Sequence, residues 1–365
     1  MPQRNHLVEP TNPRDQYSEY DDVRFAISFQ GRKLVLNSIR LMGKVVIDNN
    51  LDDDDIRMDN FAAGHCFFEE VMTSTANQGL LETIQSYPRM ISMMRKASLD
   101  EVNLMNSKFT PEMCCPNELV MRQVLKGNVL KTDSVNETQP ADFSIKPHFV
   151  FNQAEGSQFL SYSKTGDISL NLRLNRNDQV LFGSNADATK TYSLSDLRVS
   201  FITVDDDGTV DTHLLRQKAT LQQPVASSFV SISAKVPAER CVAVAASFQE
   251  NKRQAQYQYN DNAQMRLPNV SSVNFLFNDS ENRFITYEIN NNVDLFNRYL
   301  QAFRAAGQTD GTLQKLEVNN SYGIGLNWEG VLDLSSQKFT TQITSDASNT
   351  NPFTGYFYFF NNIVL

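Results

Sequence analysis

The residues best suited to chemistry form a short cluster of metal-ligand types, His65-Cys66 followed by Glu69 and Glu70. Imidazole, thiolate and carboxylate groups bind zinc, but a zinc site needs them to converge on one point. The segment is predicted to be a strand, in which neighbouring side chains point to opposite faces. Three further histidines are spread widely along the chain: His6, His148 and His213. We therefore expect a partly buried strand histidine at position 65 rather than a metal ligand.

Two acidic runs, Asp52–Asp55 and Asp205-Asp206-Asp207-Gly208, have the oxygen ligands that calcium prefers. The second run resembles half of a calcium-binding loop. It lacks the bidentate glutamate at the far end, and Thr203 stands where such a loop would begin. We expect both runs to be solvated turns.

Motifs for covalent catalysis and phosphate binding are absent: the sequence has no G-x-S-x-G, no P-loop and no G-x-G-x-x-G. Gly323-Ile324-Gly325 is a lone G-x-G within strand-like sequence. The Phe109–Cys115 stretch has two thiols but no neighbouring His or Lys to activate them. The four cysteines are Cys66, Cys114, Cys115 and Cys241, which we interpret as reduced structural thiols. We therefore expect no catalytic, cofactor-binding or metal-binding residues.

The elements that would position any site are mostly strands. Asp167–Asn175 alternates polar and apolar residues without a break, and so do residues 230–236 and 273–277. A period of two indicates half-buried strands. Many such strands, separated by Asn, Asp and Gly turns, are typical of sandwiches and barrels.

Two segments have helical spacing instead. Ile84, Tyr87, Met90, Ile91 and Met94 predict a helix over 83–97, with Pro88 near its first turn. A second helix is predicted over 293–303 and should end by Gly307, and a short third one near Glu118–Leu125. The apolar stripes of the first two helices are interpreted as core.

The run Tyr356-Phe357-Tyr358-Phe359-Phe360 places large rings on both faces of one strand. Such a strand lies either at the centre of a sheet or against another subunit. The sequence leaves both possibilities open.

Composition limits the class of protein. The chain has 365 residues, 10% aromatics and a formal net charge of −9. Its length suits two sandwiches, and its acidic character argues against nucleic-acid binding as the main role. The start of the chain lacks the apolar segment of a secretory signal, and no window has the roughly 20 apolar residues of a membrane span. Four N-x-S/T matches, at Asn136, Asn269, Asn278 and Asn319, are expected by chance in so asparagine-rich a chain.

We therefore predict an all-β fold with a few short helices, arranged as two consecutive sandwiches. Residues 1–22 are predicted to be an extended arm, 23–183 the first sandwich, 184–192 a linker and 193–365 the second sandwich. Each half is expected to have strands, one helix and further strands. No residue-level repeat relates the halves.

Several segments together resemble a known family. The segment Ala63–Val71 followed by Leu81–Tyr87 is similar to the early part of the first jelly roll in double jelly-roll major capsid proteins. Asp142–Pro147 with the following strand resembles the close of that jelly roll. Leu267–Val270, the next strand and the 293–306 helix resemble the middle of the second. In order, these motifs cover about residues 60–350.

The resemblance implies a function as well as a fold. Such proteins build the shells of tailless icosahedral double-stranded DNA viruses, among them polinton-like viruses, virophages and membrane-containing phages. The implied fold is two consecutive jelly rolls, and the implied partner is the chain itself, as a homotrimer that contacts neighbouring capsomers. Minor capsid or penton proteins and an internal membrane are further candidate partners. The implied location is the virion after synthesis inside the host cell, with no cofactor and no sequence-specific nucleic-acid binding.

Two alternatives remain. A two-domain β-sandwich binding protein, such as a minor capsid, vertex or glycan-binding protein, would need an exposed aromatic cluster, and the single Trp328 gives little support. A glycosidase needs only two carboxylates at the right separation, and no pair stands out among the 42 acidic residues.

Overall fold

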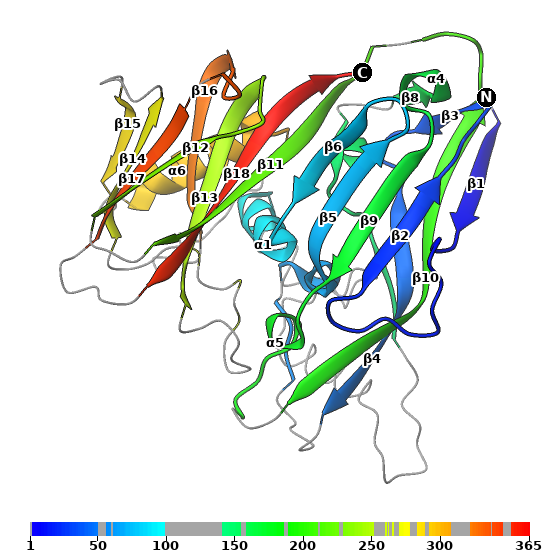
Figure 1. Ribbon diagram of the computed structural model, residues 1–365, viewed down its shortest axis with the longest axis horizontal. Coiled ribbons are helices and arrows are strands. Elements are labelled where there is room, and N and C mark those ends of the chain that lie inside the picture. Colours follow the sequence, from blue (N-terminus) through cyan, green and yellow to red (C-terminus); the bar gives the residue numbers. More distant parts are fainter. Residues whose placement is uncertain are drawn as a thin grey trace.

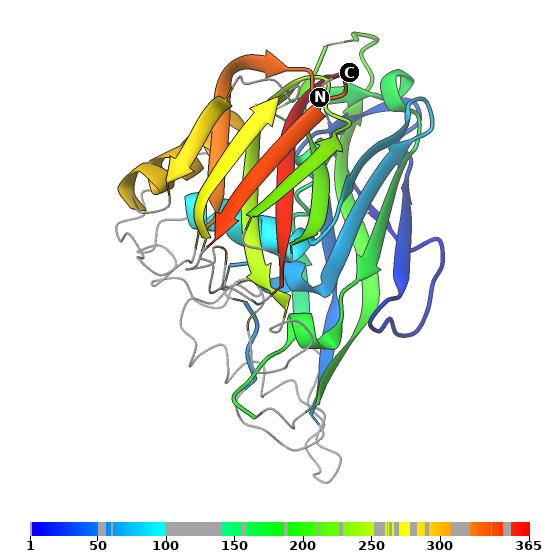
Figure 2. The ribbon, with the colours of Figure 1, turned by 60° about the vertical axis from the view of Figure 1, so that its left-hand side comes forward.

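The computed structural model (Figures 1 and 2) describes the larger part of the chain. The described residues are 2–49, 56–59, 61–98, 141–154, 158–185, 189–210, 212–225, 229–251, 260, 262, 265, 270–277, 283–288, 292–307, 322–336, 338–345 and 352–365. Their strands form three sheets, of six, eight and four strands. No described helix is long and apolar enough to cross a bilayer.

Strand pairing in the first half is nested, so that the outermost strands in the sequence pair with each other and the innermost two form a hairpin. β1 pairs with β10, β2 with β9, β3 with β8, β4 with β7 and β5 with β6, all antiparallel. The bounds are β1 Gln3–Val8, β2 Asp22–Ile27, β3 Arg32–Val35, β4 Arg40–Asn49, β5 Phe68–Thr75, β6 Gly79–Ile84, β7 Ala141–Ile145, β8 Phe159–Ser161, β9 Ile168–Leu174 and β10 Lys190–Asp205. This nested order is that of a jelly roll.

β3 and β4 act as one interrupted strand. Both pair with the same edge of β10, because β1 occupies the other edge. At the break, the Ser38 hydroxyl accepts a hydrogen bond from the Ile202 N–H (3.1 Å) and donates one to the Val35 carbonyl (2.6 Å). The first jelly roll therefore has one sheet in the order β1, β10, β3/β4, β8/β7 and a second in the order β2, β9, β5, β6.

The second half repeats this arrangement. β11 pairs with β18, β12 with β17, β13 with β16 and β14 with β15, again antiparallel. The bounds are β11 Leu214–Val225, β12 Phe229–Lys235, β13 Cys241–Glu250, β14 Val270–Phe277, β15 Arg283–Glu288, β16 Ile324–Leu332, β17 Lys338–Ser345 and β18 Phe353–Val364. Its two sheets have the orders β11-β18-β13-β16 and β12-β17-β14-β15. The predicted fold of two consecutive jelly rolls with a few short helices is confirmed.

Each jelly roll carries a helix directly after its innermost hairpin. α1 (Tyr87–Ser98) follows β6, and α6 (Asn292–Ala305) follows β15. Both helices were predicted, but α1 begins at Tyr87 and not at residue 83, so that Ile84 lies on β6. α6 ends before Gly307, which has a φ of +79°. Shorter helical turns are η1 Ala63–Phe67, η2 Val150–Asn152, α4 Tyr162–Thr165 and α5 Asn177–Val180. The two halves thus share the position of their helix as well as their strand order.

The aromatic strand β18 is a central strand, flanked by β11 and β13. Phe359 faces the interior of the second jelly roll, where its ring centroid lies 5.0 Å from that of Phe339 on β17. Phe360 faces the opposite side and lies 5.5 Å from Phe303 of α6. The rings on both faces are therefore buried within one chain, so the strand does not require a second subunit to cover it.

The strand pairing places the domain boundaries differently from the sequence-based expectation. Residues 1–22 were expected to be an arm, but β1 is an integral strand of the first jelly roll. β10 starts inside the expected linker at 184–192 and extends to Asp205, although 193 onwards was assigned to the second half. The described strands thus divide between β10 and β11, within residues 206–213.

The isolated G-x-G motif, Gly323-Ile324-Gly325, lies where two helices pack closely against the sheet. A Cβ atom on Gly325 would lie 2.7 Å from the Cα of Tyr299 and 2.8 Å from the Cβ of Ala302, both on α6. A Cβ on Gly323 would lie 2.6 Å from the Met93 side chain of α1. The glycines allow both helices to approach the sheet of β16 closely.

Gly325→Ala is expected to lower the free energy of unfolding by about 1–3 kcal/mol, because the added methyl group overpacks the contact between α6 and β16. Urea denaturation measures the change. Val331→Ala, at an exposed position on the same strand, is the control and should stay within about 0.5 kcal/mol of the wild type. Equal stability of both variants would show that α6 is not held at this distance.

Candidate functional site: the junction between the two jelly rolls

The two jelly rolls are joined edge to edge through β6 and β11 (Figure 1). These strands are parallel and share one registered residue pair, Thr83 with Ala219. Side chains supply the other hydrogen bonds: the Thr220 hydroxyl accepts from the Gln85 N–H (3.3 Å), and the Gln217 amide donates to the Leu81 carbonyl. One eight-stranded sheet therefore runs through both halves of the molecule.

A buried carboxylate and a buried ammonium group lie at the same junction. Glu82 of β6 is 3% exposed and Lys218 of β11 is 1% exposed. One carboxylate oxygen of Glu82 accepts from the Lys218 N–H (3.1 Å) and the other from the Val150 N–H (2.5 Å). Burial raises the pKa of Glu82 and lowers that of Lys218 to about 8, while the attraction between the two charges opposes both shifts. The Lys218 ammonium itself donates to the His148 and Arg216 carbonyls (3.4 Å each), so the two charges attract each other without a direct ion pair.

The helices α1 and α6 fill the space on the outer face of the β11-β18-β13-β16 sheet. The Tyr299 hydroxyl of α6 donates to the Met93 carbonyl of α1. The Tyr358 hydroxyl of β18 donates to the Ser86 carbonyl just before α1 (3.0 Å). The Arg89 guanidinium lies 4.8 Å from the ring centroid of Tyr356. The first jelly roll thus covers this face of the second with the beginning of α1.

His65 and Cys66 lie beside α1 and not on a strand, which corrects the sequence-based expectation. Both are in η1 and fully buried, whereas Glu69 and Glu70 follow on β5 and are partly exposed. Arg95 donates to Nε2 of His65 (3.2 Å). Because arginine only donates, the proton of His65 belongs on Nδ1, which lies 2.9 Å from the Tyr87 hydroxyl.

The pKa shifts of His65 and Cys66 disfavour a reactive role for this cluster. Burial and the nearby Arg95 lower the pKa of His65 well below its usual value, so the ring is neutral at pH 7. Burial, with Asp59 nearby, raises the pKa of the Cys66 thiol, which disfavours the reactive thiolate. Within the described ranges, no three His, Cys, Asp or Glu residues are grouped closely enough to hold a metal ion.

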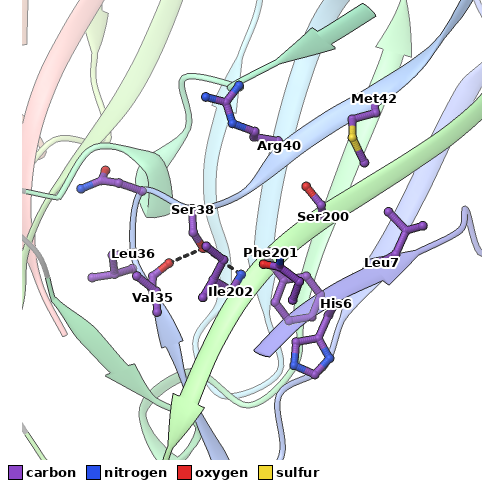
Figure 3. A pocket seen from close by; sticks show the side chains of 12 residues that line it. His6, Leu7, Val35, Leu36, Ser38, Arg40, Met42, Ser200, Phe201 and Ile202 are labelled. Carbon is purple, nitrogen blue, oxygen red and sulfur yellow. Dashed lines mark hydrogen bonds between the residues drawn. The ribbon is translucent and has the colours of Figure 1, made fainter. Parts of the chain in front are cut away.

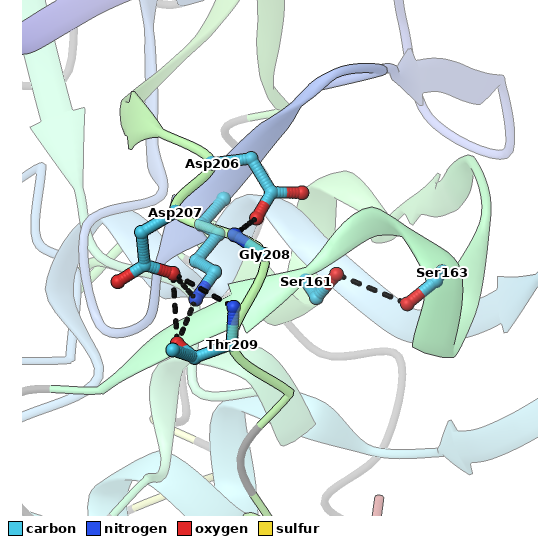
Figure 4. Close-up of polar contacts among 7 residues, drawn as sticks. Ser161, Ser163, Asp206, Asp207, Gly208 and Thr209 are labelled. Carbon is cyan, nitrogen blue, oxygen red and sulfur yellow. Dashed lines mark hydrogen bonds and ion pairs between the residues drawn. The ribbon is translucent and has the colours of Figure 1, made fainter.

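The turn Asp205–Gly208 connects the two jelly rolls, and basic residues of the chain pair with two of its aspartates. Figure 4 shows the hydrogen bonds from the Thr209 N–H to Asp207 and from the Gly208 N–H to Asp206. Asp205 pairs with Arg32 at 2.5 Å, and Asp207 pairs with Lys33, which is 2% exposed. The Lys33 ammonium also donates to the Thr209 hydroxyl (2.6 Å). The hydrogen bond from Lys33 and those from Thr209 lower the pKa of Asp207. Two of the three aspartates are therefore ion-paired, while Asp206, Asp207 and Gly208 are exposed, as expected of a solvated turn.

Asp207→Asn is expected to lower the melting temperature at pH 7, because the variant leaves the buried Lys33 without its counter-ion. The lowered pKa means that Asp207 stabilises the fold above its ordinary value of 3.8 and loses this effect as the pH falls further. The difference between variant and wild type should therefore shrink at pH 3. Asp206→Asn is the matched control, since Asp206 accepts the Gly208 N–H of its own turn and forms no ion pair with the described residues. Thermal scans at both pH values test the prediction; a variant as stable as the wild type at pH 7 contradicts it.

Other candidates from the sequence are structural or lie outside the described residues. The Trp328 indole is half-buried and donates to the Cys241 carbonyl (2.7 Å), and burial raises the pKa of the Cys241 thiol to about 12. The candidates outside the described residues are Asp52–Asp55, Phe109–Cys115, Glu118–Leu125 and the four N-x-S/T asparagines, Asn136, Asn269, Asn278 and Asn319.

A shallow hollow of about 660 Å³ lies on the outer face of the sheet that contains β1 (Figure 3). Its lining residues come from β1, β10 and the β3/β4 segment: Asn5, His6, Leu7, Val35, Leu36, Asn37, Ser38, Arg40, Met42, Ser200, Phe201 and Ile202. Leu7 is 54% exposed there, whereas His6 stacks on Phe201 with ring centroids 4.8 Å apart. This surface was not expected from the sequence, in which residues 1–22 have the composition of an extended arm.

This chain is similar to known proteins in its structure but not in its sequence. No family model matches the chain, and no curated protein matches it. A solved model of the PBCV-1 virus capsid is similar with a TM-score of 0.58 and 13% identity, over 100% of this chain and 94% of the other.

Two major capsid proteins give similar results. That of Faustovirus has a TM-score of 0.55 and 8% identity, over 100% of this chain and 90% of the other. That of mavirus has a TM-score of 0.54 and 8% identity, over 99% and 87%. The similarity therefore extends over the whole length of both jelly rolls. The chain has the double jelly-roll fold found in these viral major capsid proteins.

Proposed function

We propose that this chain is the major capsid protein of a tailless icosahedral virus and acts as a structural subunit of the virion. The observation that carries the proposal is the junction of β6 with β11, which fixes two jelly rolls of the same strand order side by side in one chain. Its similarity to viral capsid proteins from end to end supports the same function.

The geometry also supports a homotrimer. A chain with two similar jelly rolls side by side contributes two of six units to a ring, so three copies close it with a roughly hexagonal outline. Closed rings form when head-to-tail contacts repeat by a rotation that returns to its start. Hexagonal units of this kind tile a shell, where they contact neighbouring capsomers and minor capsid or penton proteins.

A structural role is supported by the contacts of the reactive residue types, which take part in packing and in ion pairs within the chain. His65 and Cys66 are packed in the core, Asp205 and Asp207 are ion-paired within the chain, and Gly325 allows a close helix contact. The acidic chain would bind poorly to a nucleic-acid backbone, which favours contact with proteins or an internal membrane.

Light scattering behind size-exclusion chromatography, with negative-stain images of the main peak, tests the proposal. We expect a trimer with a hexagonal outline. A protein that stays monomeric at high concentration would contradict the proposal and favour a binding protein, for which glycans would be screened next.

A further inference from the structure

The junction within one chain joins the fifth strand of one jelly roll to the first strand of the next. Counting β3/β4 and β8/β7 as single strands, β6 is the fifth strand of the first jelly roll and β11 is the first strand of the second. The equivalent strands that remain are β15, the fifth of the second jelly roll, and β1, the first of the first. Each is the last strand of its sheet, and no described strand pairs with its outer edge.

We propose that the contact between neighbouring copies repeats the internal junction, with β15 of one copy parallel to β1 of the next. We call this contact the seam. The inference rests on the proposed trimer, for which it names the contacting strands. If one rotation relates the first jelly roll to the second, the same rotation carries the β6–β11 contact onto a β15–β1 contact with the next copy. Three internal junctions and three seams then close a ring of six jelly rolls.

The seam would use the edges of β1 and β15 that no described strand occupies. An edge strand exposes a row of N–H and carbonyl groups that readily pair with another chain. At the internal junction, such groups are satisfied by one registered pair together with hydrogen bonds to side chains, as between Glu82 and the Lys218 N–H. A second copy would satisfy the edge of β1 in the same way.

The hollow beside β1 is a second reason to expect another copy of the chain at this position. In the second jelly roll, the outer face of the equivalent strands is covered by its own helix α6, through Phe303, and by the start of α1 from the first jelly roll, through Ser86 and Arg89. In the first jelly roll, the outer face of β1, β10 and β4 instead carries the hollow, with Leu7 exposed at its edge. A neighbouring second jelly roll placed by the same rotation would cover this hollow and bury Leu7.

Cross-linking tests the seam directly. Leu7→Cys is combined with Ile285→Cys or, in a second protein, with Thr286→Cys, because neighbouring residues on a strand point to opposite faces. The full-length proteins are treated with a short bismaleimide. We expect at least one pair to give covalent dimers and trimers in denaturing gels. The single-cysteine variants control for the native thiols, of which Cys66 and Cys241 are buried.

The outcome separates the seam from the proposed function. A trimer in light scattering that gives no cross-link with either pair overturns the seam and leaves the capsid proposal standing. A monomer overturns both. Equal cross-linking of the single-cysteine controls and the pairs would show that the reaction is non-specific. This result would also count against the seam.

A charge at the seam provides a second, independent test. Leu7→Lys should shift the trimer to monomer, because it places an ammonium group where the neighbour would bury an apolar side chain. Leu80→Lys is the matched control on the internal β5–β6 hairpin, where the leucine is 62% exposed, and it should remain trimeric. Both residues are exposed within one chain, so circular dichroism should show both variants folded. A folded, trimeric Leu7→Lys protein would overturn the seam.

Discussion

A protein that lacks residues 1–22 is expected to lose the cooperative unfolding of its first jelly roll and to aggregate. The deletion removes β1, which pairs with β10 over six residues. It also removes Tyr17, which is 1% exposed and exchanges two backbone hydrogen bonds with Leu194 (2.8 and 2.9 Å). Loss of a large buried aromatic side chain alone costs about 3–5 kcal/mol, and the bared edge of β10 becomes a template for aggregation.

Solubility and thermal unfolding followed by circular dichroism measure this effect. A protein that lacks only Met1 and Pro2, which precede β1, should behave as the wild type. Tyr17→Ala should be destabilised but soluble, which separates loss of the side chain from loss of the strand. A soluble, cooperatively folded protein without residues 1–22 would show that the segment is a dispensable arm after all.

Lys218→Met is expected to lower the free energy of unfolding by about 1–3 kcal/mol at pH 7.5, because the His148 and Arg216 carbonyls lose a charged donor and the buried Glu82 carboxylate loses the attraction of a nearby positive charge. The effect depends on pH with a known sign. The pKa of Glu82 is raised in the folded state, so folding is favoured below its ordinary value of 4.5 and penalised as the pH rises through the raised value. The variant should therefore recover much of the lost stability at pH 5.

Urea denaturation at both pH values tests this prediction. The double variant Glu82→Gln with Lys218→Met removes both charges and should be more stable at pH 7.5 than Lys218→Met alone. In the wild type, the pKa of Lys218 is lowered to about 8, so stability should rise as the pH increases above that value, and Lys218→Met should lack this rise. A pH-independent loss in Lys218→Met would mean that the side chain acts through packing alone.

The sequence predicted the elements whose side chains show a clear period. The helices α1 and α6 and the strands β9, β12 and β14 all carry an apolar face, and the described side chains of that face are buried or, like Val230 and Leu300, partly buried. β1 was missed because it is an edge strand with mostly exposed side chains, so it has no apolar alternation to detect. The segment before β5 was predicted as a strand because its residues are apolar, but η1 buries all five of its residues as a helical turn.

The junction could be predicted only in part. Glu82 and Lys218 are 136 positions apart in the sequence, and nothing local indicates that they meet. A signal for Glu82 did exist: it lies two residues before Ile84, on the apolar face of a strand, where an acid requires a partner. The nested pairing of whole strands is set by tertiary contacts and leaves no mark in the sequence period.

The pairing of β1 with β10 also affects the order in which the chain can fold during synthesis. His6 and Thr203, which form a hydrogen bond at this pairing, are 197 positions apart, so the first strand leaves the ribosome long before its partner exists. Such distant closure is slow, because the loop entropy is lost before the contact forms. The first jelly roll can nevertheless close once β10 has emerged, before β12 to β18 are made. Newly made chains therefore carry an unpaired β1 for most of that time, and a chaperone or a second nascent chain has its best opportunity to bind in this interval.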